Sequence, residues 1–192
     1  MSTLFVDTVE PEGVTTTLTL GASGDTVALG AGAVASGFGG GKVLQVLQAT
    51  KTDSETTTTA GWDDVTGLSI AITPSAVTSK VLVMTNVLCV GTVGAAGAWT
   101  NIVRDSTQIA MATSAGSRVA ASAFGYAPDT GDTRHHSTVW LDSPATTSAT
   151  TYKVQFSANG TNTAYINRTE AATDSNAYAR GVSTITVMEI GA

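Results

Sequence analysis

Charged residues are scarce in this chain of 192 residues. Asp, Glu, Lys and Arg together make up 12% of it, about half the share in an average globular domain. Because Glu, Lys and Arg are also strong helix formers, their scarcity excludes a helical bundle. The net charge of −6 argues against a nucleic-acid-binding protein, which needs a basic face to displace counterions.

Two further features are missing from the sequence. Cys89 is the only cysteine, so the chain cannot form an internal disulfide. The N-terminal segment MSTLFVDTVEPEG lacks the basic and apolar regions of a signal peptide, and no apolar run approaches the roughly 20 residues of a membrane span. We therefore expect a protein made in a reducing cytoplasm.

Small and β-branched residues dominate what is present. Thr, Ala, Val, Gly and Ser account for 119 of the 192 residues. Thr and Val favour strands, and Gly favours turns. The 42% of hydrophobic residues argues against disorder. The length suits one domain, or one domain with an appendage.

Residues 1–41 differ from the rest because they contain no Lys or Arg. Short alternating pieces such as TLTL and TVAL lie between Gly-Ala-Ser turns, and neither piece can bury a face alone. A disordered tail is one interpretation. We favour an extended, repetitive anchoring arm that orders against sister chains or another protein and ends in a Gly-rich hinge. The candidate contact residues are Leu4, Phe5, Val6, Val9, Leu18, Leu20, Val27 and Leu29, and the hinge residues are Gly37, Gly39, Gly40 and Gly41.

Residues 42–192 show the pattern of successive short strands without a helix. Alternation or continuous apolar character predicts strands at 43–49, 68–73, 81–90 (a central strand covered on both faces), 99–103, 109–111, 119–126, 136–141, 152–156 and 183–190. Asn159-Gly160 predicts a two-residue hairpin that pairs 152–156 with 163–166. The expected fold is therefore all-β: an N-terminal extended arm (1–41) followed by an antiparallel, jelly-roll-like β-sandwich domain (42–192).

Several segments resemble a β-rich surface domain of tailed phages, especially marine and cyanobacterial ones. They are GKVLQVLQATKT at 41–52, DVTGLSI at 64–70 with ITP at 72–74, SKVLV at 79–83, RDST at 104–107, LDSP at 141–144, TTYKVQ at 150–155 and STITVMEI at 183–190; TLTLGASGDTV at 17–27 resembles the preceding arm. The resemblance implies a homotrimeric virion surface protein that decorates the capsid or ends a fibre. Its motifs mark no catalytic centre.

Candidate chemical groups are few, and most have a structural interpretation. His135 and His136 are adjacent, so on a strand they point to opposite faces and do not easily ligate one metal ion. Asp63-Asp64 and the group Asp129, Asp132 and Asp142 would need further oxygens to bind calcium. Cys89 lies in an apolar strand and is expected to be a core residue. We expect no cofactor and no catalytic residues.

The aromatic residues leave two interpretations open. Trp62, Trp99 and Trp140 flank or lie in strands, which favours the core; the alternative is a sugar-binding platform, to which Tyr126, Tyr165 and Tyr178 could contribute.

Together with the resemblance, the sequence predicts a non-enzymatic phage structural protein on the virion surface. We favour a trimeric capsid decoration or cement protein, whose partners are itself and the major capsid protein or another virion protein. The alternatives are a tail-fibre or head-fibre tip that binds host polysaccharide and, least favoured, a polysaccharide-degrading enzyme.

Overall fold

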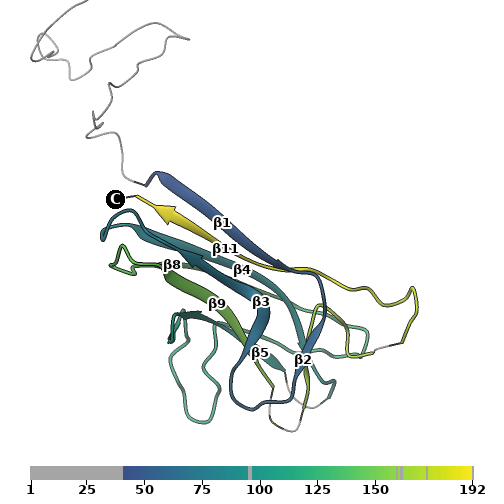
Figure 1. The fold of residues 1–192 in the computed structure, drawn as a ribbon. Helices are drawn as coiled ribbons and strands as arrows, with labels where there is room; N and C mark the ends of the chain where they lie inside the picture. Colours follow the sequence, from purple (N-terminus) through teal and green to yellow (C-terminus); the bar gives the residue numbers. More distant parts are fainter. Residues whose placement is uncertain (1–40, 95–96, 159, 161, 172, 192) are drawn as a thin grey trace, which may run out of the picture. The chain divides into compact units, whose positions relative to one another are not determined.

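A computed structural model describes residues 41–191, apart from 95, 96, 159, 161 and 172. These residues contain strands and no helix (Figure 1). The strands are β1 (Val43–Lys51), β2 (Glu55–Thr57), β3 (Asp63–Ile72), β4 (Lys80–Gly91), β5 (Ala98–Arg104), β6 (Thr107–Ile109), β7 (Ala123–Gly125), β8 (His135–Asp142), β9 (Thr150–Ser157), β10 (Ala164–Ile166) and β11 (Ser183–Ile190). The expected all-β class is confirmed.

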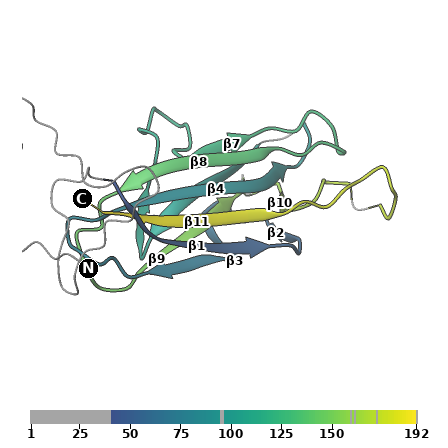
Figure 2. The same cartoon turned by 90° about the horizontal axis from the view of Figure 1, so that it is seen from above.

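The strands form two antiparallel sheets in a sandwich-like arrangement. The first sheet has the order β1-β11-β4-β10-β2, with β8 paired to β4. The second has the order β3-β9-β5-β6, with β7 paired to β5. Figures 1 and 2 show β1, β11, β4 and β8 side by side in one layer, with β3 and β9 in the other.

The hydrophobic core lies between the sheets and follows the two-residue period of the strands. β4 contributes Val81, Val83 and Val87, which are fully buried, and β9 contributes Tyr152 and Phe156 from the opposite sheet. Side chains at alternate positions of one strand point to one face. The alternation in these sequences therefore selects the face of each sheet that forms the core.

The predicted hairpin at Asn159-Gly160 is wrong. β9 pairs with β3 and β5, whereas β10 pairs with β2 and β4 in the other sheet. At the end of β9, the Ala158 N–H donates to the Thr59 carbonyl instead. An Asn-Gly pair favours a tight reversal locally, but here the two strands pair with other strands, in different sheets.

Other strand predictions need smaller corrections. The strand expected at 119–126 is limited to β7, because only its last residues pair with β5, and the strand at 109–111 lies earlier, as β6. β2 was not predicted. β4 is central as expected, but it is not covered on both faces, since Leu82 and Met84 are only half-buried.

The predicted arm lies almost entirely outside the described residues. Leu4, Phe5, Val6, Val9, Leu18, Leu20, Val27 and Leu29 fall there, as do Gly37, Gly39 and Gly40. Gly41 is described: its N–H donates to the Gly191 carbonyl at 2.9 Å, and the Gly191 N–H donates to the Lys42 carbonyl at 2.8 Å. The chain thus enters β1 beside the end of β11.

Candidate functional site

The first sheet carries an apolar surface on its outer side, away from the core. The register places Val46 of β1 opposite Met188 of β11, Met188 opposite Leu82 of β4, and Leu82 opposite Leu141 of β8. Directly opposed residues share a face, so these four side chains form one apolar row. The next row contains Gln48, Thr186, Met84 and Val139. We call these two rows the outer face.

The outer face is exposed to a degree that is unusual for large apolar side chains. Val139 is 66% exposed, Leu141 55% and Val46 52%. Neither row contains a charged residue. The first row is entirely apolar, the second combines Met84 and Val139 with the polar pair Gln48 and Thr186, and the following row is wholly polar, with Thr50, Thr184, Asn86 and Ser137. An antiparallel sheet face in contact with water normally carries polar side chains. A contiguous exposed apolar patch marks an interaction surface.

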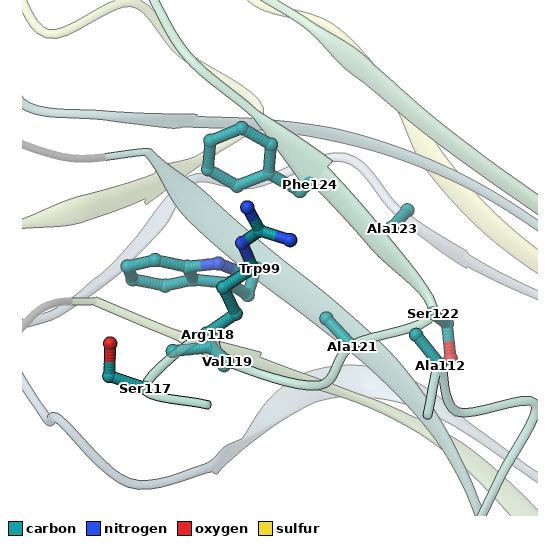
Figure 3. Close-up of a pocket in the computed structure, with 9 residues that line it drawn as sticks. All are labelled: Trp99, Ala112, Ser117, Arg118, Val119, Ala121, Ser122, Ala123 and Phe124. Atoms are coloured by element: carbon teal, nitrogen blue, oxygen red, sulfur yellow. The ribbon is translucent and has the colours of Figure 1, made fainter. Parts of the chain in front are cut away.

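A groove forms the second candidate site, on the outer face of the second sheet. Trp99 of β5 and Phe124 of β7 are cross-strand partners, and their ring centroids are 5.9 Å apart. The segment 110–122 returns to β5, where Ser122 N–H donates to the Thr100 carbonyl. The groove between this segment and the two rings has a volume of about 690 Å³ (Figure 3). Arg118 lines it and carries its only charge among the described lining residues.

Buried polar side chains join the two sheets along β8. Asp142 accepts hydrogen bonds from Arg104 Nη1 at 2.8 Å and from Tyr152 Oη at 2.6 Å. Burial, together with the Asp142 carboxylate, raises the pKa of Tyr152 well above its usual value. Because Arg104 and Tyr152 belong to the second sheet and Asp142 to the first, this cluster is an inter-sheet tie.

The two histidines lie on opposite faces, as predicted. His136 is buried, and its Nδ1 lies 3.1 Å from Thr100 Oγ1 of the second sheet. His135 is exposed, and its Nδ1 lies 3.0 Å from Asn86 Oδ1. Burial, and to a lesser extent His135, lowers the pKa of His136 to about 4. His136 therefore stays neutral at pH 7 and serves as a packing residue.

The acidic candidates do not assemble into one site. Asp63 accepts a hydrogen bond from Thr57 Oγ1, and Asp64 pairs with Lys153 at 2.7 Å. Asp129 accepts from the Gly131 N–H, whereas Asp132 lies near Arg134. Among the described residues, no group of three or more His, Cys, Asp or Glu side chains could hold a metal ion.

Among the described residues, Glu189 is the carboxylate that accepts the most hydrogen bonds, and sequence reasoning missed it. It is 1% exposed and points inward from β11. Oε1 accepts from Ser75 N–H, Ser75 Oγ and Ser79 Oγ at 2.6–2.7 Å, and Oε2 accepts from Gln45 Nε2 at 2.7 Å. Burial alone would raise the pKa of Glu189, but these hydrogen bonds outweigh it and lower the pKa to about 2. Glu189 thus holds the 73–79 loop against the sheet.

The prediction that the three tryptophans belong to the core is wrong. Trp140 is 43% exposed, and Trp62 and Trp99 are half-buried. Tyr126 is 44% exposed, whereas Tyr165 is half-buried beneath Arg168, whose guanidinium carbon lies 5.0 Å from the ring centroid. Of these tryptophans and tyrosines, only Trp99 lines the groove. Cys89, by contrast, is a core residue as expected, and burial raises the pKa of its thiol.

No protein-family model matches the chain, and no curated protein matches it. Among the described residues, no helix is long and apolar enough to cross a membrane.

Proposed function

We propose that this protein is a non-enzymatic structural component of a tailed-phage particle, a homotrimeric capsid decoration or cement protein on the virion surface. The outer face is the observation that carries this proposal. Three of its side chains, Val46, Val139 and Leu141, are more than half exposed. A sheet face with this composition is suited to contact another protein surface, because covering it removes apolar area from water.

A second copy of the same chain fits the outer face. In a symmetric oligomer, residues near the axis meet their own copies, so a charge there would be opposed by the same charge. The two rows of the outer face contain no charged residue. The resemblance of segments such as 41–52 and 183–190 to phage surface domains supports three further parts of the proposal. These are the trimeric state, the jelly-roll-like topology and the location on a virion.

Residues 1–41 are proposed to attach the trimer to the major capsid protein or another virion protein. Their covalent connection enters β1 at Gly41, which is hydrogen-bonded to Gly191. Once one arm of a trimer is bound, the other two arms are held near their own binding sites at a high effective concentration. The trimer is therefore retained although each arm binds modestly. The low share of charged residues in the whole chain, 12%, suits a protein that docks through apolar and main-chain contacts.

Light scattering on the purified chain tests the oligomeric state. We expect a mass near three times 19.4 kDa. The variants Val139→Lys and Leu141→Lys place charges on the outer face at exposed positions, so they should lower the mass while the fold persists. Val77→Lys, at a position that is 59% exposed between β3 and β4, is the matched control and should remain a trimer. A monomeric wild type at micromolar concentration, or unchanged masses in both outer-face variants, would contradict the proposal.

Sedimentation with particles that lack the protein tests attachment. A variant without residues 1–36 should remain folded and trimeric but should not co-sediment, whereas the full chain should. Equal retention of both forms would show that the β-domain itself is the anchor. Labelled particles separate decoration from a fibre: we expect many copies over the capsid rather than a few at the tail.

A fibre tip that binds host polysaccharide is the second candidate. The groove between the 110–122 segment and the Trp99 and Phe124 rings favours it, because accessible aromatic ring surface beside polar groups is suited to small-ligand recognition. The two candidates differ in copy number and location on the particle.

A further inference from the structure

The groove beside Trp99 has the dimensions and the lining of a small-ligand site. Its volume of about 690 Å³ lies in the range of roughly 300–1,000 Å³ that is typical of such sites. Trp99 is half-buried and Phe124 is 59% exposed, so the Trp99 indole is held by the fold while the Phe124 ring is open to a ligand. The rings are inclined at 34° to each other. Together they present apolar ring surface on one side of the groove.

Arg118 supplies the charge that selects the ligand. Figure 3 shows its guanidinium extending toward the space between the Trp99 and Phe124 rings. In the part of the chain that the structure describes, no carboxylate lies within ion-pair distance of Arg118. A guanidinium binds carboxylate or sulfate through two parallel hydrogen bonds. In a chain with a net charge of −6, an arginine without an acidic partner in a groove is suited to an acidic ligand.

Polar groups at the rim can bond hydroxyl groups. Ser122 Oγ accepts a hydrogen bond from the Ile102 N–H at 3.3 Å, and it donates to no acceptor within the described residues, so its hydroxyl hydrogen can donate to a ligand. The Ser117 hydroxyl lines the groove as well. A ligand that combines an apolar C–H face, hydroxyl groups and an acidic group matches this set of partners.

We propose that the groove binds an acidic saccharide, in which a sugar ring packs against Trp99 and Phe124 and its carboxylate or sulfate pairs with Arg118. A nucleic acid is disfavoured, because a polyphosphate needs several cations along its path and Arg118 is the only charged residue among the described lining residues. The site is independent of the proposed self-association. Trp99 lies on the outer face of the second sheet, whereas Val139 and Leu141 lie on the outer face of the first.

Isothermal titration of the full chain with matched saccharides tests the proposal. The acidic probes are tri-galacturonate, sialyllactose and a sulfated disaccharide, and the neutral probes are maltotriose and lactose. We expect at least one acidic probe to bind at millimolar concentration or below, about tenfold or more tighter than the neutral probes, which is the difference expected from one bidentate charged pair. Inorganic sulfate and a short oligothymidylate are included as further probes.

Three variants assign any binding to the groove. Arg118→Gln should remove the preference for acidic over neutral probes, and Phe124→Ala should weaken both kinds of probe. Arg180→Gln, at an exposed position whose side chain donates to Ser54, is the matched control and should bind as the wild type does. Circular dichroism checks that each variant is folded. Arg118→Gln should leave the oligomeric mass unchanged, and Val139→Lys should leave binding unchanged, so failure of one proposal does not imply failure of the other.

Four results would overturn the proposal. One is that no acidic saccharide binds at millimolar concentration. A second is binding that survives both Arg118→Gln and Phe124→Ala. A third is inorganic sulfate that binds as tightly as the sulfated disaccharide, which would reduce the site to an anion site. The fourth is oligothymidylate that binds more tightly than every saccharide and depends on Arg118, which would assign the groove to a nucleic acid.

Discussion

The imidazole of His136 packs directly against the backbone of Gly125, so closely that a Cβ atom on Gly125 would lie 2.3 Å from Nε2 of His136. His136 belongs to β8 of the first sheet, and Gly125 belongs to β7 of the second. Together with the contact between His136 Nδ1 and Thr100 Oγ1, this packing joins the sheets on the side where β8 is the edge strand. The join depends on a neutral ring and on the absence of a side chain at position 125.

Acid should weaken the protein through His136. Its folded-state pKa is about 4, against 6.5 in the unfolded chain, so between these values the unfolded chain binds a proton that the folded protein resists. Stability is therefore lost as the pH falls from 6.5 toward 4, and the loss at pH 4.5 should be roughly 2 to 3 kcal/mol relative to pH 7.5. Urea unfolding at both pH values measures it.

Two glutamine variants isolate this titration. His136→Gln should remove most of the loss, whereas His135→Gln, its exposed neighbour, should retain it. Carboxylates titrate equally in both variants, so their effect cancels in the comparison. If both variants lost the same free energy of unfolding between the two pH values, His136 would not be the titrating group.

Gly125→Ala should destabilise the protein by about 1–3 kcal/mol, the cost typical of overpacking. The added methyl group would also lie 3.1 Å from Arg134 Cβ, so two neighbours must move. Thermal unfolding measures the effect. Gly61→Ala is the control, because a Cβ there would meet only an ordinary contact, Thr59 Cγ2 at 3.4 Å.

A double variant tests the contact itself. Adding His136→Ala to Gly125→Ala provides the missing space, so the two costs should sum to more than the cost of the double variant. Strict additivity of the two changes would contradict direct packing between these residues.

Most of the strands could be predicted from the sequence because they alternate between apolar and polar residues or form continuous apolar runs. β9 and β11 are examples: TYKVQF and STITVMEI place buried residues at every second position over most of their length. β2 could not be predicted, because ETT is short and polar and becomes a strand only through pairing with β10. The hairpin error at Asn159-Gly160 has the same origin, since pairing between distant segments overrides a local turn preference.

The candidate sites depend on which face of a strand is turned inward, and a sequence pattern does not fix that choice. In β5 the pattern AWTNIVR turns Ala98, Thr100 and Ile102 toward the core, which places Trp99 on the opposite face of the sheet. The tryptophan was therefore misassigned to the core. The outer face was missed for a related reason. The continuous apolar sequence of β4 indicated that other parts of the same domain bury both of its faces. The sequence of one strand does not show whether the domain itself or another protein surface buries a given face.

Glu189→Gln should cost about 2–4 kcal/mol, because hydrogen bonds to a buried charge contribute more than neutral ones and an amide cannot accept at both positions. The amide nitrogen donates hydrogens and cannot accept them. It would therefore meet another donor, either Gln45 Nε2 or the Ser75 and Ser79 groups. Urea unfolding at pH 7 measures the cost. Glu170→Gln, whose carboxylate accepts from Val93 N–H, is the control.

The pH dependence of the stability of Glu189→Gln provides a second test of the role of Glu189. The pKa of Glu189 is about 2 in the folded protein, against 4.5 in the unfolded chain, so its contribution is present above pH 4.5 and lost as the pH falls toward 2. The difference between wild type and Glu189→Gln should therefore shrink below pH 4.5. A difference that stays constant down to pH 2.5 would show that the cost comes from shape rather than charge.

Asn101→Leu should leave stability unchanged or raise it by about 1 kcal/mol. Asn101 is 1% exposed, and within the described residues neither atom of its amide has a hydrogen-bond partner, so an apolar side chain of similar size removes a desolvation cost without breaking a bond. The matched control is Asn167→Leu. The Asn167 amide is equally buried but donates to the Lys51 and Asp53 carbonyls and accepts from Ser183 Oγ at 2.6 Å, and its backbone is left-handed at φ 58°. Its replacement should cost several kcal/mol, because it leaves buried groups without partners and strains the backbone. Urea unfolding of both variants decides: a comparable loss for Asn101→Leu would show that its amide is bonded in solution.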